Sequence, residues 1–118
     1  MEVPLVYRQN WEDLITRVRS ECICEIGVSS SLAINFFFKA EYSSDLCVHC
    51  YVKCITVKLN LMSSSTGEVI EHEFLRQVAG TTPSMISRCK NGTIALKDPC
   101  LIGYYMYQCI VSSLLVPV

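Results

Sequence analysis

Hydrophobic residues recur with a helical period near the start of the chain. Four of them, at positions i, i+3, i+4 and i+7, fall on one face of a helix: Trp11, Leu14, Ile15 and Val18. Asn10 precedes them and is a favourable N-cap residue. The pattern therefore predicts a helix over residues 11–19 that packs one apolar stripe against a core.

The hydrophobic period then changes from 3.6 residues to two. Alternation of hydrophobic and polar side chains is typical of a half-buried strand. It runs through residues 22–28 and again through residues 32–38, on either side of Ser29-Ser30-Ser31. These two segments predict a β-hairpin with a serine turn.

Residues 46–62 carry the longest strand-like pattern. Hydrophobic residues occupy even positions up to Cys54 and odd positions from Ile55 onward. A shift of one residue turns every following side chain to the other face of a sheet, and a β-bulge near Cys54 and Ile55 would absorb it. We therefore predict one long strand with a bulge; a strand that crosses between two sheet faces is the alternative.

The segment that follows mixes helix and turn signals. Hydrophobic residues share a helical arc over 68–79, and Gly80 follows them, which favours a second helix there. Asn91-Gly92 is typical of a two-residue hairpin turn, although Thr82-Pro83 is a typical helix start. Together the patterns predict an α+β fold in a single domain over residues 1–118: an N-terminal helix on a mostly antiparallel sheet of five or six strands.

The C-terminal residues 99–118 contain no charged side chain. The stretch over 100–118 is close to the roughly 20 residues that span a membrane, so a tail anchor is one hypothesis. However, three tyrosines lie inside the stretch, whereas a membrane gathers tyrosines at its interfaces. We therefore prefer two buried strands, over 100–107 and 108–116. The candidate partner-binding residues on this segment are Tyr104, Tyr105 and Tyr107.

Eight cysteines in 118 residues raise the question of their redox state. An even number in a short chain is compatible with a disulfide framework. The first residues, however, lack the features of a secretory signal. We therefore expect free thiols in a reducing compartment, the cytoplasm or nucleus, with disulfides as the alternative.

One segment gathers several residue types that bind metals. The candidate ligands are Cys47, His49, Cys50 and Cys54. Cys47 and Cys50 have the spacing of a zinc knuckle, but in a strand Cys47 and His49 would face away from the other two. The expectation is therefore a protein without a cofactor, with zinc as the alternative.

Composition and missing motifs narrow the function. The net charge of -1 gives no basic footprint for nucleic acid, and no GxSxG, phosphate-binding glycine loop or HExxH sequence points to an enzyme. With 51% hydrophobic residues, we expect a non-enzymatic protein-interaction or regulatory protein that self-associates, of the type of a viral accessory protein that binds host factors. The alternatives are a small zinc-stabilised module that binds protein or nucleic acid, and a tail-anchored membrane protein.

Overall fold

The computed structural model describes residues 2–27 and 46–117, and the regular secondary structure of these residues is entirely helical. The helices are α1 (Leu5–Thr16), α2 (Arg19–Ile26), α4 (Leu46–Lys58), α5 (Glu71–Gln77), α6 (Pro83–Asn91) and α7 (Pro99–Leu114). Extended pairing within these ranges is limited to isolated bridges, such as the one between Glu2 and Val116. The predicted α+β fold with an antiparallel sheet is therefore wrong.

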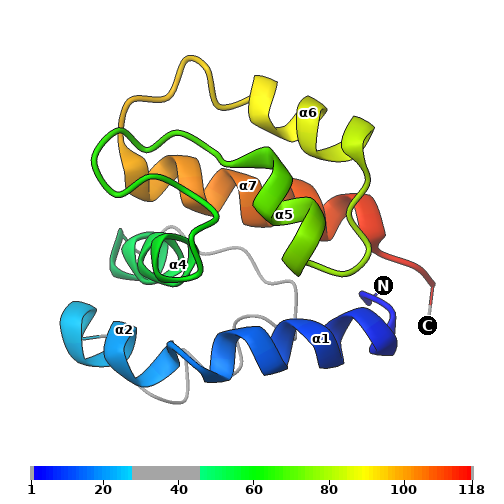
Figure 1. Ribbon diagram of the computed structural model, residues 1–118, viewed down its shortest axis with the longest axis horizontal. Helices are drawn as coiled ribbons and strands as arrows, with labels where there is room; N and C mark the ends of the chain where they lie inside the picture. Colours follow the sequence, from blue (N-terminus) through cyan, green and yellow to red (C-terminus); the bar gives the residue numbers. More distant parts are fainter. Residues whose placement is uncertain (1, 28–45, 118) are drawn as a thin grey trace.

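The helices stack in layers around α4 and α7 (Figure 1). α1 and α2 follow one another along one side, and α6 lies on the opposite side, beyond α7. α4, seen end-on in this view, lies between α1–α2 and α7, and its contact with α7 is the most extensive in the fold. The two ends of the chain meet, because Glu2 and Val116 exchange backbone hydrogen bonds of 3.0 and 2.8 Å.

The predicted N-terminal helix is present but begins earlier. α1 starts at Leu5, directly after Pro4, and ends at Thr16. Its buried residues are three of the four predicted ones, Trp11, Leu14 and Ile15; the fourth, Val18, follows the end of the helix and is half-buried. Asn10 is therefore no N-cap; it lies inside the helix, and its side-chain oxygen accepts a hydrogen bond from the Ala79 backbone N–H at 3.0 Å.

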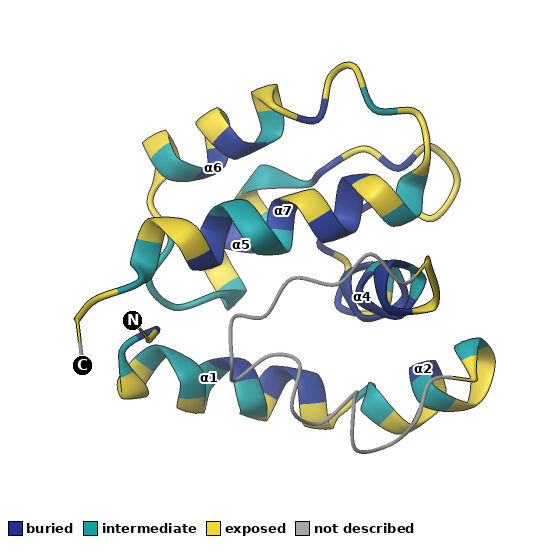
Figure 2. Cartoon of the chain, turned by 180° about the vertical axis from the view of Figure 1, so that it is seen from behind, coloured by how far each residue is buried: buried dark blue, intermediate teal, exposed yellow. Residues whose placement is uncertain are grey.

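The predicted strand over 46–62 is replaced by helix α4. Seven of its residues are buried: Val48, His49, Tyr51, Val52, Cys54, Ile55 and Thr56. Figure 2 shows the buried colour around most of this helix. A helix that is buried on most sides carries hydrophobic residues on most faces, so no single helical stripe stands out in the sequence. Its valine, isoleucine and threonine residues also favour strands intrinsically, a preference that packing overrides.

The predicted β-hairpin over residues 22–38 is wrong in its first strand. Residues 22–26, most of the first predicted strand, belong to α2. The second predicted strand, over 32–38, lies outside the described residues.

The middle of the chain forms two short helices. A helix is present within the range 68–79, as α5 over Glu71–Gln77. The prediction of a hairpin at Asn91-Gly92 is wrong, because Asn91 is the last residue of helix α6. That helix starts at Pro83, and the Thr82 hydroxyl accepts a hydrogen bond from the Met85 N–H at 3.3 Å, which is the helix start that Thr82-Pro83 offered as the alternative.

The uncharged C-terminal segment is the central helix α7 and not a pair of strands. Asp98 caps it, accepting a hydrogen bond from the Cys100 N–H at 2.9 Å, and Pro99 is its first residue. Its buried residues, which include Ile102, Met106 and Ile110, contact the core. A helix packed between neighbours has few positions for a charge. None of the described helices is long and apolar enough to cross a membrane.

Candidate functional site

Three disulfides join the helices. Cys22–Cys54 links α2 to α4, Cys50–Cys100 links α4 to α7, and Cys89–Cys109 links α6 to α7. Disulfides of this kind persist in oxidising environments. The expectation of mostly free thiols in a reducing compartment is therefore wrong. Cys24 and Cys47 lie outside the three disulfides, and both are exposed.

A cavity of about 80 Å³ lies in the core. Its described wall comes from α1, α4, α5 and α7 and from the loops that flank α5. The residues that line it are Trp11, Leu14, Ile15, Val52, Ile55, Thr56, Leu59, Leu61, Phe74, Val78, Gly103, Met106, Tyr107, Ile110 and Val111.

This wall is almost wholly hydrophobic. Its polar atoms among the described residues belong to Trp11, Thr56 and Tyr107. The Trp11 indole N–H donates to the Ala79 carbonyl at 3.0 Å, and the Thr56 hydroxyl donates to the Val52 carbonyl at 2.7 Å. Water needs two to four polar partners to occupy a cavity, so a wall of this kind favours an apolar occupant over water.

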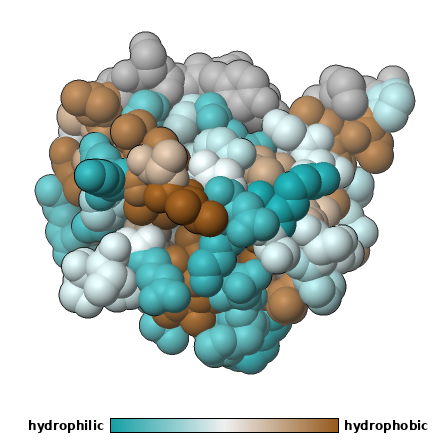
Figure 3. Space-filling model, turned by 90° about the horizontal axis from the view of Figure 1, so that it is seen from above, coloured by the Kyte–Doolittle hydropathy of each residue, from teal (hydrophilic) through white to brown (hydrophobic). Residues whose placement is uncertain are grey.

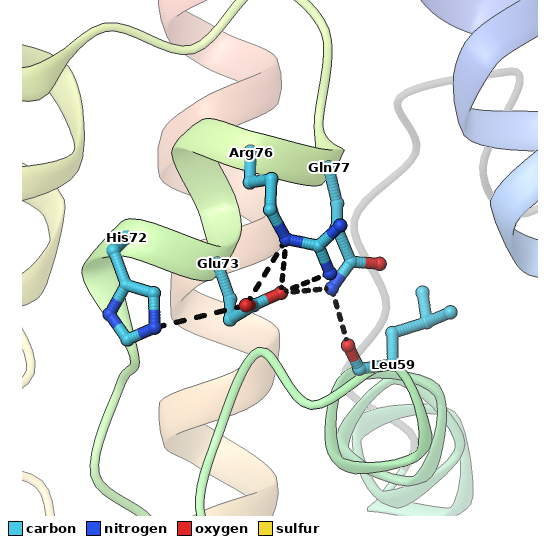
Figure 4. A network of polar contacts seen from close by, with 5 residues as sticks. All are labelled: Leu59, His72, Glu73, Arg76 and Gln77. Carbon is cyan, nitrogen blue, oxygen red and sulfur yellow. Dashed lines mark hydrogen bonds and ion pairs between the residues drawn. The ribbon is translucent and has the colours of Figure 1, made fainter.

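Helix α5 is fixed against the end of α4 by a polar network (Figure 4). Gln77 Nε2 donates to the Leu59 carbonyl at 2.7 Å and to a Glu73 carboxylate oxygen at 2.8 Å. Arg76 binds the same carboxylate at 2.7 Å, and this hydrogen bond lowers the pKa of Glu73. The network positions Phe74, which is buried and lines the cavity.

The turn after α5 is held from two sides. Asn10 and Trp11 bond the N–H and carbonyl of Ala79. Gly80 has a φ of +92°, and a Cβ there would lie 2.9 Å from Leu114 and 3.0 Å from Tyr7. Glycine is therefore required by both the backbone conformation and the close approach of α1 and α7.

A partly buried ion pair connects α1 and α2 at their junction. The Arg19 guanidinium binds both carboxylate oxygens of Glu12, at 3.0 and 2.7 Å. Hydrogen bonding to Arg19 lowers the pKa of Glu12. Bidentate geometry of this kind holds the two helices in one orientation, and it supports the part of α1 that carries Trp11 and Leu14.

The structure does not bring the four candidate zinc ligands together as a metal site. Cys50 and Cys54 are bonded to Cys100 and Cys22, respectively. His49 is buried, with its ring centroid 4.1 Å from that of Tyr104, whereas Cys47 is exposed. Within the described ranges no group of three or more His, Cys, Asp or Glu residues could hold a metal ion, so zinc is not supported.

Of the three candidate tyrosines, Tyr104 and Tyr107 lie on one side of α7, with ring centroids 6.1 Å apart, and Tyr105 lies on another side. Tyr104 is buried against His49, Tyr107 is half-buried and lines the cavity, and Tyr105 is 36% exposed. On the face that carries α6, hydrophobic patches alternate with hydrophilic residues (Figure 3). The hydrophobic surplus noted in the sequence thus goes largely into the core and the cavity wall.

The model of the PBP/GOBP family matches residues 7–113. The chain belongs to the PBP/GOBP family. This family comprises small extracellular odorant- and pheromone-binding proteins of insects. Comparison with curated proteins and with solved structures gives no match.

Family membership corrects several expectations of function. A PBP/GOBP protein is neither a viral accessory protein, nor a zinc module, nor a tail-anchored protein. The family binds small hydrophobic ligands, so the expected protein partner and homo-oligomer are wrong as well. Family membership and the three disulfides together indicate a secreted extracellular protein, and not one of the cytoplasm or nucleus. The coarser expectation of a binding protein rather than an enzyme agrees with the family.

Sequence reasoning found the α1 part of the cavity wall and missed the rest. Val52, Ile55 and Leu59 have the helical spacing i, i+3, i+7, and Gly103, Met106 and Ile110 have the same spacing. This helical spacing occurs in the same segments as the patterns that predicted strands. The separation of the cysteines carried no information on which of them pair.

Proposed function

We propose that the protein binds one small hydrophobic ligand in the cavity between α1, α4, α5 and α7. The observation that carries this proposal is the hydrophobic wall to which these helices contribute. The atoms that line an empty cavity lack van der Waals partners on one side. An apolar ligand restores these contacts and leaves water at the same time.

The size of the cavity sets the scale of the ligand. An engineered apolar cavity of roughly 150 Å³ binds benzene, and the cavity here measures about 80 Å³. A short alkyl chain suits this volume. Larger ligands, six-carbon chains included, require the wall to move, and Met106 is a wall residue whose unbranched side chain adapts readily.

The single tryptophan of the chain provides the assay, because Trp11 lines the cavity. Bromine quenches indole fluorescence on close contact, so titration with 1-bromohexane should give saturable quenching in the wild type. Ile110→Phe fills part of the cavity and should weaken the binding about tenfold or more.

A matched control adds the same side chain elsewhere. Ile94 is 78% exposed and does not line the cavity, so Ile94→Phe should bind 1-bromohexane as the wild type does. Absence of saturable quenching in the wild type, or equal weakening by both variants, would refute binding in this cavity.

A further inference from the structure

We propose that the cavity selects ligands by their lack of polar groups, so that it prefers hydrocarbons to alcohols and carboxylates with the same carbon chain. This inference rests on the proposed function and specifies its ligand class. It follows from the chemistry of the described wall, which offers van der Waals contact almost everywhere and hydrogen bonds almost nowhere.

The donors of two wall residues are already used within the protein. Trp11 and Thr56 are both 7% exposed, and each donates its N–H or O–H to a backbone carbonyl. Neither can donate to a ligand without breaking its hydrogen bond to the half-buried Ala79 carbonyl or to the Val52 carbonyl within α4. That loss offsets what the ligand would gain.

Charge is absent from the described wall. None of its residues is Asp, Glu, Lys or Arg. Acidic groups that adjoin wall residues along the chain include Glu12, beside Trp11, and Glu73, beside Phe74. The Arg19 guanidinium binds the first carboxylate, and the Arg76 guanidinium binds the second (Figure 4). A carboxylate ligand would therefore leave water without a cation to pair with, which is the costliest kind of burial.

The remaining hydroxyl of the described wall belongs to Tyr107, which is half-buried. Its ring centroid lies 6.1 Å from that of Tyr104, so the side chain packs along α7. Phenylalanine can replace Tyr107 with the same ring, and valine can replace Thr56 with the same shape. These two substitutions test whether either hydroxyl serves as a polar anchor.

The experiment is competition against 1-bromohexane, read by recovery of Trp11 fluorescence in sealed cuvettes. The competitors are hexane, 1-hexanol and hexanoate at neutral pH. We expect 1-hexanol to compete about tenfold or more weakly than hexane, and hexanoate about a hundredfold or more weakly, because their polar groups are buried without partners. Thr56→Val and Tyr107→Phe should leave this order unchanged.

The outcomes separate this inference from the proposed function. If 1-bromohexane does not bind, the proposed function fails at this cavity. If it binds and 1-hexanol or hexanoate competes as well as hexane, binding stands and the selection by polarity is refuted. It is also refuted if either variant weakens 1-hexanol more than hexane, because the lost hydroxyl was then an anchor.

Discussion

Removal of the Cys50–Cys100 disulfide tests how far covalent links stabilise the packing of α4 on α7. Both cysteines are half-buried, so Cys50→Ala together with Cys100→Ala removes little packed surface. The bond closes a sequence separation of 50 residues, for which the loop-entropy relation gives about 4 kcal/mol of unfolding free energy. Domains are stable by only about 5–15 kcal/mol, so the loss is a large share.

The assay is urea unfolding under non-reducing conditions, followed by circular dichroism at 222 nm and by Trp11 fluorescence. The double variant should lose about 3–4 kcal/mol. Its dependence on urea should steepen, because the unfolded chain becomes less compact. Cys24→Ala is the control: this cysteine is exposed and outside the disulfides, so its loss should change stability by less than about 0.5 kcal/mol.

A loss below about 1 kcal/mol in the double variant, with coincident transitions by both probes, would refute the reasoning. The stability would then reside in the helix contacts, and the bond would add little to them. A similar loss in Cys24→Ala would also refute it, because the effect would then not come from the closed loop.

Two further predictions concern a close helix contact and an ion pair. A Cβ at Gly103 would lie 3.1 Å from the Lys53 Cα, so Gly103→Ala should fail to give the usual helix gain of about 1 kcal/mol and should lower stability instead; a gain in urea unfolding would contradict the close contact. Because Arg19 lowers the pKa of Glu12 in the folded state, the pair stabilises the fold above the unfolded pKa, and this contribution is lost as the pH falls through the folded pKa. The stability difference between wild type and Glu12→Gln should therefore be largest near neutral pH and shrink below about pH 4.5; a difference that is constant down to pH 3 would show that the carboxylate charge is not involved.

The sequence predicted helices best where one face is exposed. α1 has a buried face with Trp11 and Leu14 and a charged outer face, so its period was readable. α4 and α7 are the two central helices, and both lack such a contrast. In α7 the uncharged hydrophobic run predicted buried strands or a membrane anchor. A buried helix lacks charged residues just as a buried strand does, so the run does not distinguish them.

The disulfides were missed for a different reason. The first residues lack the features of a secretory signal, which predicts a reducing compartment and free thiols, whereas the even number of cysteines is compatible with disulfides. The spacing of the cysteines also did not distinguish helix from strand in α4. Cys50 and Cys54 share a face in a strand, and they share a face in a helix as well. Each bonds a different helix from that face, Cys50 to α7 and Cys54 to α2.

The disulfides and the cavity are linked through stability. A cavity of about 80 Å³ costs about 2 kcal/mol at about 24 cal/mol per Å³. For a chain of 118 residues this is a considerable loss. Each disulfide, with sequence separations of 20 to 50 residues, contributes about 3–4 kcal/mol in the loop-entropy relation. The links can thus offset the cost of the cavity. In the proposed binding, the same cavity supplies the contact energy of an apolar ligand.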